Sequence, residues 1–459
     1  MRESLKRAIF RSSKLLHYIL TVLLFAVYYY VFVYGAFRLD KMVLRHSVMV
    51  VIYALVVLFS MRSYSAYNVG LSRISMLVYS QSLADIVSAG ILYVLLVINQ
   101  LKLLNPLPLL AMVAVQMLFN VLWSFLTNRL YFSMFKPRKT VVIHSDAEAL
   151  SRLDELKDFD RKFQIVRRIE SHGDDIHDLL PQLEGAEAVF VSGISATQRN
   201  GILKYCVEKS IRCYVSPRVG DVLMQGSSHM ELFSAPLLRV MRAAPPVEYV
   251  VIKRLIDIVA ALVGIVLTSP FMLITALAIK LTDKGPVLYK QVRLTMNGKK
   301  FKILKFRSMR VDAEKDGVAR LASENDDRIT PVGKIIRACR LDELPQLFNI
   351  LKGDMTIVGP RPERPEIAEQ YEKILPAFSL RLQAKAGLTG LAQVYGKYNS
   401  DPYDKLRMDL MYINNMSLSE DIKLMFATVK VLFMKESTSG IAEGQTTAAK
   451  SEDKEFAMK

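Results

Sequence analysis

Histidine is absent from the second half of the chain. All six histidines lie between His17 and His229, so residues 230–459 contain none. A histidine-based zinc site is therefore excluded from that half. If the chemistry of the protein lies there, it has to use carboxylates and bound metal rather than imidazole.

Cysteine is scarce as well. Cys206, Cys213 and Cys339 have no metal-binding spacing, and three thiols cannot all pair. They indicate a reduced, cytosolic setting. Zinc-finger spacing, basic-region heptads and aromatic RNA-binding motifs are also missing, so we expect no nucleic-acid partner.

Hydrophobic residues and positive charge, by contrast, are both abundant. The chain is 51% hydrophobic and carries a formal net charge of +17. Soluble enzymes rarely combine the two. The combination is typical of a membrane protein whose cationic parts face anionic headgroups or phosphorylated substrates.

Four apolar runs within residues 1–135 predict a four-helix transmembrane bundle, because each approaches the roughly 20 residues that cross a bilayer. The runs lie near 13–35, 46–64, 77–98 and 106–128. No small-residue cleavage site follows the first run, which is therefore interpreted as a retained anchor. Lys and Arg at the ends of the runs number eleven on one side and four on the other. The positive-inside bias places the amino terminus and residue 136 onward in the cytoplasm.

Residues 137–245 alternate strand-like runs ("TVVIHS", "AVFVSG" and "IRCYVS") with charged helical segments. This alternation predicts a Rossmann-like α/β domain. The glycine fingerprint of dinucleotide-binding domains is missing, because "TVVI" is followed by His144-Ser145-Asp146-Ala147. Without those glycines a backbone cannot approach a pyrophosphate, so a structural or regulatory role is favoured over nucleotide binding.

A fifth apolar segment covers residues 255–281 and is broken at Ser269-Pro270, because proline removes a backbone hydrogen bond and clashes with the preceding turn. Ten basic residues and one acidic residue follow between 280 and 310. A plain kinked span is the simplest interpretation of this segment.

The carboxyl-terminal end contains two further segments. Residues 419–436 predict an amphipathic helix that could lie on the membrane. Residues 438–459 are polar and small, which is typical of a disordered tail.

The stretch "CRLDELPQLFNILKGDMTIVGPRPERPE" contains two adjacent carboxylates, Asp342 and Glu343, just before a predicted helix. Apolar residues at 344, 347, 348 and 351 share one face of that helix. Pro345 suits its first turn and Gly353 the position just past its end. The helix macrodipole stabilises anions near its start by roughly 0.3–1 kcal/mol each. A helix cap is the simplest interpretation of an arbitrary Asp-Glu pair.

Basic residues around the pair favour a phosphate site instead. They are Arg337, Arg340, the turn Gly359-Pro360-Arg361-Pro362, and Lys305 and Arg307 in "FKILKFRSMR". Guanidinium and ammonium groups suit phosphate oxygens. Adjacent carboxylates repel each other, and a magnesium ion that bridges Asp342 and Glu343 to a phosphate would relieve this repulsion.

These motifs resemble a known family. Residues 251–437 are similar to the catalytic module of the bacterial sugar transferases, the monotopic polyprenyl-phosphate phosphoglycosyl transferases. The matching stretches, in order, are "KRLIDI", the Ser269-Pro270 break, "KGPVLYKQVR", "FKILKFRSM", "RLDELPQLFNILKGDM", "VGPRP", "AGLTGLAQVYGKYN" and "MDLMYI". With four spans and a Rossmann-like domain in front, the chain resembles the long form that initiates exopolysaccharide, capsule or O-antigen synthesis.

The resemblance implies an activity and its participants. A sugar phosphate would pass from a UDP-sugar to undecaprenyl phosphate, with release of UMP and a requirement for magnesium. Asp342 would be the nucleophile, and Glu343 its acidic partner or a metal ligand. The catalytic module would lie on the cytoplasmic face of the bacterial inner membrane, among membrane lipids, and family analogy favours a homodimer.

Two other classes of function stay open. A membrane-anchored nucleotide-sugar dehydratase would share the front half of the chain, but it would need an intact glycine-rich loop. A non-catalytic scaffold of a polysaccharide assembly complex would leave the Asp342–Glu343 cluster unexplained.

We expect the segment 255–281 to enter and leave the membrane by the same face rather than cross it. Charge counting places its start in the cytoplasm, and a spanning helix would put Asp342 outside, away from cytoplasmic nucleotide sugars. The cations that follow residue 279 would then lie on the side that positive charge avoids. In a re-entrant helix, the Ser269 hydroxyl could bond groups that Pro270 leaves free.

Overall fold

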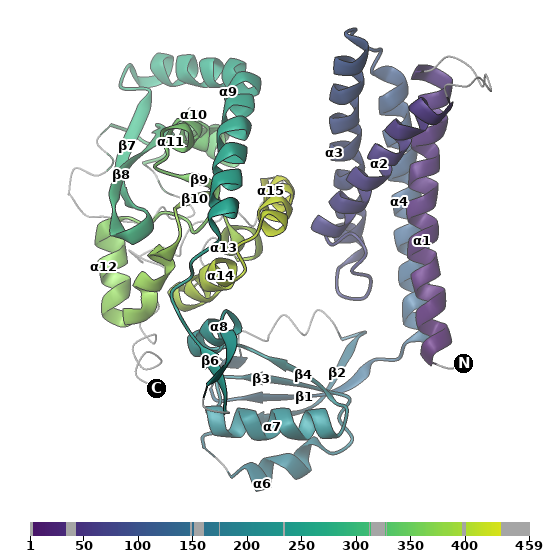
Figure 1. Cartoon of the computed structure of the whole chain (residues 1–459), viewed down its shortest axis with the longest axis vertical. Helices are drawn as coiled ribbons and strands as arrows, with labels where there is room; N and C mark the ends of the chain where they lie inside the picture. Colours follow the sequence, from purple (N-terminus) through teal and green to yellow (C-terminus); the bar gives the residue numbers. More distant parts are fainter. Residues whose placement is uncertain are drawn as a thin grey trace. The chain divides into compact units, whose positions relative to one another are not determined.

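The computed structural model of the protein describes most of the chain and divides it into two units, Met1–Ser216 and Pro217–Lys459 (Figure 1). The described residues are 3–33, 43–146, 149–150, 160–173, 175–232, 235–311, 313, 326, 328–396 and 401–432. The predicted disordered tail at 438–459 lies outside them. The architecture is a mixture of helices and sheets.

The first unit begins with helices at all four predicted apolar runs. They are α1 (Glu3–Tyr28), continued by the π-helical turn Tyr29–Val33, then α2 (Val43–Ser63), α3 (Ile74–Gln100) and α4 (Leu107–Met134). Among the described residues, α1 with its π turn, α3 and α4 are long and apolar enough to cross a membrane. The apolar part of α2, Ser47–Ser63, is shorter. Three candidate spans are therefore found, and the four-helix transmembrane bundle stays a prediction.

A parallel sheet follows in the same unit, with the strand order β2-β1-β3-β4. Its elements are β1 (Arg138–His144), β2 (Phe163–Glu170), α6 (Ile176–Leu179), the 3-10 turn Leu180–Leu183, β3 (Ala188–Ser192), α7 (Ala196–Glu208) and β4 (Arg212–Val215). Val141, Ile143, Val189 and Val191 pack with α6 and α7 in one apolar core. The three predicted strands are confirmed. The sequence did not reveal β2, because this edge strand ("FQIVRRIE") buries only its first and seventh residues.

The second unit contains the carboxylate pair. Its elements are α8 (Val219–Gln225), β5 (Ser228–Leu232), β6 (Ala235–Arg239), α9 (Val247–Asp283), β7 (Leu288–Leu294), η4 (Met296–Gly298), β8 (Lys300–Phe306), α10 (Pro331–Ala338), η5 (Leu341–Glu343), α11 (Gln346–Lys352), β9 (Thr356–Val358), α12 (Pro365–Ile374), η6 (Pro376–Gln383), β10 (Gly387–Thr389), α13 (Leu391–Tyr395), α14 (Pro402–Asn414) and α15 (Leu418–Leu432). Strands β7 and β8 form an antiparallel hairpin, and β9 and β10 a parallel pair. The amphipathic helix predicted near 419–436 is α15.

The boundary between the units differs from the predicted one. Residues 217–245 were expected to belong to the Rossmann-like domain, whereas the structure groups them with the second unit. The reason is packing: Val222 on α8 is fully buried in a core that also contains Val358, Leu406 and Leu410. The sequence placed no such contact, because it joins segments more than a hundred residues apart.

Helix α9 is continuous over 37 residues with Pro270 inside it, and Figure 1 shows that it changes direction sharply. The helix is not interrupted at the predicted break, because Ser269 and Pro270 both lie within α9. Pro270 has no N–H for the carbonyl of Val266, and the Ser269 hydroxyl donates to that carbonyl at 2.8 Å. The Ser269 hydroxyl thus bonds a carbonyl that Pro270 leaves free, while the role of this pair in a membrane and the re-entrant course stay predictions.

Two side chains of α9 attach it to the rest of the unit. The Asp257 carboxylate accepts hydrogen bonds from the Thr356 hydroxyl at 2.6 Å and from the Ile357 N–H at 3.0 Å. The Arg254 guanidinium donates to the carbonyls of Ile350 and Leu351 at 2.6 and 2.7 Å. Through these bonds α9 fixes both β9 and the carboxyl end of α11.

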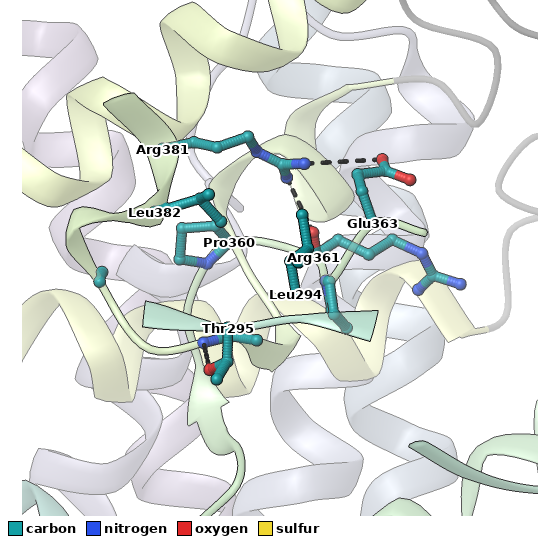
Figure 2. A pocket seen from close by; sticks show the side chains of 10 residues that line it. Leu294, Thr295, Pro360, Arg361, Glu363, Arg381 and Leu382 are labelled. Carbon is teal, nitrogen blue, oxygen red and sulfur yellow. Dashed lines mark hydrogen bonds and ion pairs between the residues drawn. The ribbon is translucent and has the colours of Figure 1, made fainter. Parts of the chain in front are cut away.

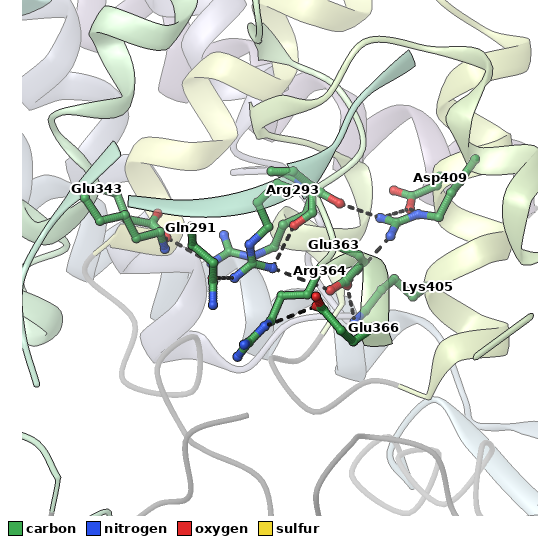
Figure 3. Close-up of polar contacts among 12 residues, drawn as sticks. Gln291, Arg293, Glu343, Glu363, Arg364, Glu366, Lys405 and Asp409 are labelled. Atoms are coloured by element: carbon green, nitrogen blue, oxygen red, sulfur yellow. Dashed lines mark hydrogen bonds and ion pairs between the residues drawn. The ribbon is translucent and has the colours of Figure 1, made fainter. Parts of the chain in front are cut away.

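A buried ionic cluster forms around Glu363, the residue that follows the Gly-Pro-Arg-Pro turn (Figure 3). The Arg381 side chain is 2% exposed and contacts the Asp409 carboxylate at 2.6 Å and that of Glu363 at 3.6 Å. Lys405 lies 3.1 Å and Arg293 3.9 Å from Glu363. Burial alone would raise the pKa of Glu363, but these three cations lower it to about 2. Burial prevails at Asp409 and raises its pKa.

We predict that Glu363 makes the stability of this unit sensitive to acid. Its pKa is lower in the folded state than the ordinary value of 4.5, so its contribution is complete above about pH 4.5 and is lost as the pH falls toward about 2. The difference corresponds to roughly 3 kcal/mol. The variant Glu363→Gln should be less stable at pH 7 and should show a flatter decline over this interval.

The measurement is the thermal unfolding midpoint of the full chain in lipid nanodiscs between pH 2 and pH 7. Glu369→Gln is the matched control, because the Glu369 side chain is 71% exposed. Parallel pH profiles for wild type and Glu363→Gln would contradict the prediction.

Candidate active site

Asp342 and Glu343 lie in a short 3-10 turn, η5, immediately before α11. Gly353 ends α11 in the left-handed conformation with φ 96°, as the sequence predicts. Neither carboxylate caps the helix, since no side-chain capping bond is made at η5 or α11. The helix-cap interpretation is therefore not supported. Phe348 was expected on the buried apolar face of this helix, but its side chain is 45% exposed.

Asn349 joins this segment to strand β8. Its Oδ1 accepts from the Leu304 N–H at 2.9 Å, and its Nδ2 donates to the Lys302 carbonyl at 2.9 Å. The Asn349 side chain thus replaces a neighbouring strand at the edge of β8. The attachment brings Lys305, near the end of β8, to the carboxylate pair.

Glu343 is surrounded by three cations. Its Oε1 lies 2.9 Å from Lys305 Nζ and 2.9 Å from Arg361 Nη2, and its Oε2 lies 3.8 Å from Arg340 Nη1. Burial would raise the pKa of Glu343, but Lys305, Arg361 and Arg340 together hold it well below its usual range. Glu343 is therefore an ionised carboxylate with a fixed position.

Asp342 has a different environment. Within the described residues its carboxylate forms no hydrogen bond and no ion pair. Burial raises its pKa and the Glu343 charge adds to this, while Lys305, Arg337 and Arg361 oppose both. The two adjacent carboxylates are thus unequal: Glu343 is neutralised by direct contacts, and Asp342 is half-buried, unbonded and more basic.

The turn that contains Arg361 is fixed by its backbone. The Gly359 N–H donates to the Thr389 carbonyl at 2.8 Å, and the Pro360 carbonyl accepts from the Gly387 N–H at 2.9 Å. A Cβ at Gly359 would lie 2.3 Å from the Lys385 carbonyl oxygen, so only glycine fits there. Arg361 therefore approaches Glu343 from a rigid turn.

Arginine side chains bind two backbone carbonyls of the turn. The carbonyl of Pro362 accepts from Arg293 at 3.1 Å, and that of Arg361 from Arg381 at 2.8 Å. Pro360 and Pro362 line a small pocket shown in Figure 2, together with Leu294, Thr295, Arg361, Glu363, Arg381, Leu382, Ala384 and Ala386. Asp342 and Glu343 do not line it, so the pocket lies behind the turn rather than at the carboxylate pair.

The remaining predicted residues divide into two groups. Arg337, in the last turn of α10, lies close enough to Asp342 to oppose the rise in its pKa. Arg307 is 6% exposed, and its guanidinium lies against Gly285, where a Cβ would come within 2.2 Å of it. It is not one of the main charges that shift the pKa of Asp342 or Glu343. The structure thus brings Lys305, Arg337 and Arg361 to the pair, but not Arg307.

Asp342 and Glu343 offer few ligands, so they suit only a metal ion that takes most of its ligands from substrate phosphates and water. The described part of the chain contains no group of three His, Cys, Asp or Glu side chains that could hold a metal. Magnesium is commonly bound by one or two carboxylates together with substrate phosphates. The unbonded Asp342 carboxylate and Oε2 of Glu343 are compatible with such a site.

Sequence reasoning missed the residues that support the site. Glu363 stands two positions after Arg361, and Asp409 lies within "MDLMYI", but their burial cannot be read from one sequence. Asn349 lies within "RLDELPQLFNILKGDM", but nothing in that stretch indicates its contact with β8, and Arg381 lies outside every quoted motif. Their roles depend on long-range contacts that only the fold reveals.

Comparison with known proteins gives the family. The model of the family described as "Bacterial sugar transferase" matches residues 248–435. A UDP-glucose:undecaprenyl-phosphate glucose-1-phosphate transferase from Caulobacter vibrioides is 39% identical over 229 residues, which are 48% of this chain and 85% of that protein.

Two further relatives are 44% identical over shorter shares of their length. One is a UDP-N-acetylgalactosamine-undecaprenyl-phosphate N-acetylgalactosaminephosphotransferase from Aeromonas hydrophila, matched over 41% of this chain and 45% of its own. The other is a UDP-glucose:undecaprenyl-phosphate glucose-1-phosphate transferase from Klebsiella pneumoniae, matched over 41% of each chain. This chain thus spans less than half the length of these two relatives. It contains the residues 248–435 that carry the family match, with the carboxylate pair at their centre, and it belongs to the bacterial sugar transferase family.

Proposed function

We propose that this protein transfers a sugar phosphate from a UDP-sugar to undecaprenyl phosphate, releasing UMP and forming a polyprenyl-diphosphate sugar. The observation that carries the proposal is the unequal pair: an unbonded Asp342 next to a Glu343 bound by three cations, inside the segment matched by the family. The relatives are named for glucose and N-acetylgalactosamine phosphates with undecaprenyl phosphate as acceptor. The product would be the first membrane intermediate of exopolysaccharide, capsule or O-antigen synthesis.

The reaction begins with Asp342. An oxygen of its carboxylate attacks the phosphorus that carries the sugar, the P–O bond to UMP breaks, and UMP leaves with the electron pair. Lys305, Arg337 and Arg361 surround the position where charge develops, and positive groups fixed in advance stabilise such a transition state. Because burial makes Asp342 more basic, it is a better nucleophile than a carboxylate in water.

The second half-reaction restores the enzyme. A phosphate oxygen of undecaprenyl phosphate attacks the same phosphorus, and the bond to Asp342 breaks. Glu343 does not react: it holds Lys305 and Arg361 in place through contacts of 2.9 Å each. Magnesium bound by Asp342 or Glu343 and the substrate diphosphate would neutralise phosphate charge.

The location proposed for this chemistry is the cytoplasmic face of the bacterial inner membrane. The outer surface of α9 is strongly apolar on both sides of its bend. Exposed residues there include Val259, Leu262, Val263, Val266, Leu267, Phe271, Leu273, Ile274, Leu277 and Leu281. A bent apolar helix that enters one leaflet and returns would keep η5 at the level of the lipid phosphate. Four transmembrane helices, a Rossmann-like domain and a homodimer complete the proposed arrangement.

We predict that Asp342→Asn lowers turnover by roughly 1,000-fold or more, because an amide cannot form the acyl-phosphate bond. The assay is UMP release by the full chain in nanodiscs, over a panel of UDP-sugars with undecaprenyl phosphate. Glu369→Gln is the control for a carboxylate change on the surface. Near-normal turnover of Asp342→Asn would show that Asp342 is not the nucleophile. If no UMP is released until undecaprenyl phosphate is added, the two-step order is excluded.

We also predict that Arg361→Lys and Arg337→Lys each lower kcat/KM by roughly 10- to 100-fold, because lysine keeps the charge but loses the planar fork. Arg239→Lys is the matched control, since Arg239 lies on the exposed hairpin β5–β6. Wild-type kinetics for both variants would show that these guanidiniums only contribute to the surface charge.

The course of α9 is tested by accessibility in intact cells. In a background without the three native cysteines, we predict that neither Val250→Cys nor Lys290→Cys reacts with a membrane-impermeant thiol reagent from outside. Both should react after the membrane is opened. Labelling of position 290 from outside, without labelling of position 250, would show that α9 spans the membrane.

A further inference from the structure

The helical part of the first unit has a polar interior that the transferase reaction does not use. His17 on α1, Asp85 on α3, and Gln116 and Asn120 on α4 are all 0% exposed. These three helices are the ones long and apolar enough to cross a membrane. Ionisable side chains at such depth are costly, and they usually have a partner or a function.

The Asn120 amide determines which atoms donate and which accept in the hydrogen bonds of this interior. Its Nδ2 donates to Asp85 Oδ2 at 2.7 Å, so its Oδ1 is left to accept. His17 Nε2 lies 3.0 Å from that oxygen and must therefore carry the proton. His17 Nδ1 then accepts from the Tyr67 hydroxyl at 3.0 Å. Both ring nitrogens are satisfied in the neutral tautomer, so His17 is not a positive counter-ion for Asp85.

Two buried oxygens nearby have no donor. Among the described residues, neither Asp85 Oδ1 nor Gln116 Oε1 has a hydrogen-bond partner. Gln116 precedes Asn120 by one helical turn, so the two amides share a face of α4. The other atom of the Gln116 amide, Nε2, donates to the Tyr53 hydroxyl at 3.0 Å and the Thr21 carbonyl at 3.1 Å.

No described lysine or arginine neutralises Asp85. Within the part of the chain that the structure describes, Asp85 forms no ion pair. Lys14, the basic residue next to this interior, donates instead to the Tyr67 carbonyl at 2.8 Å. An ionised Asp85 would thus be a fully buried charge without a cation, which is strongly unfavourable.

We propose that Asp85 is a proton-binding site inside the helical unit and carries its proton on Oδ1. Oδ2 already accepts from Asn120, so Oδ1 is the oxygen left for the O–H bond. The proton comes from hydronium, which is left as water. The new O–H is the donor that Gln116 Oε1 lacks, directly or through one water molecule, so one proton satisfies both unbonded oxygens.

The test is infrared spectroscopy of the full chain in lipid nanodiscs at neutral pH. We expect a C=O stretching band of a protonated carboxyl group that shifts in D2O, is lost in Asp85→Asn and is retained in Asp178→Asn. Asp178 is the matched control, because it is an exposed carboxylate of the same unit. Turnover should be unchanged in Asp85→Asn, since the amide resembles the neutral acid. Identical carboxyl bands in wild type and Asp85→Asn would overturn the proposal.

A second variant keeps the proposal testable if Asp85→Asn does not fold. Gln116→Leu removes the proposed acceptor and leaves Asp85 in place. The C=O band should then move to higher frequency in protein labelled with 13C at the aspartate carboxyl groups. An unchanged band frequency would show that the Asp85 O–H does not donate to Gln116, which contradicts the proposal.

Discussion

The contacts of Glu343 with Lys305 and Arg361 are the interaction on which the arrangement of the site depends. They join three segments that are separate in sequence: strand β8, the turn η5 and the Gly-Pro-Arg-Pro turn. Each cation is attracted to Glu343 but lies near Asp342 as well. The fixed Glu343 carboxylate thus holds Lys305 and Arg361 close to the neighbouring Asp342. The two adjacent carboxylates differ because the charge of Glu343 is neutralised by three cations, whereas the Asp342 carboxylate makes no such contact among the described residues.

A second set of charged side chains, Arg381 and Arg293 with their carboxylate partners, holds the turn that contains Arg361. The turn itself has few side chains to pack, so the carbonyls of Arg361 and Pro362 are bound by Arg381 and Arg293. Those guanidiniums are in turn neutralised by Glu363 and Asp409. Buried ion pairs are weak evidence for stability, because desolvation offsets much of the attraction. Their directional bonds are better understood here as fixing the position of one arginine.

The sequence alone predicts the elements that depend on local pattern. Helices form at the four apolar runs, β1, β3 and β4 lie where strands were predicted, and α11 begins directly after Pro345 and ends at Gly353. Asp342 and Glu343 stand out because two adjacent carboxylates among cations are unusual. Arg307 was assigned to the site because it is close to Lys305 in sequence, yet its side chain lies against Gly285. The sequence does not tell where the side chain of Arg307 lies, one residue past the end of β8, nor that Val222 packs in one core with Val358.

The anchoring of α9 joins the helix proposed to enter the membrane to both halves of the candidate site. Asp257 binds the strand that leads into the Arg361 turn, and Arg254 binds the end of the helix that follows Asp342 and Glu343. Both side chains lie on the part of α9 before the bend, within the motif "KRLIDI". A shift of this helix would therefore move both halves of the site together and preserve the distance between Glu343 and Arg361. In the proposed transferase, which would meet one substrate in water and the other in lipid, such a rigid connection would let α9 set the depth of the Asp342 carboxylate.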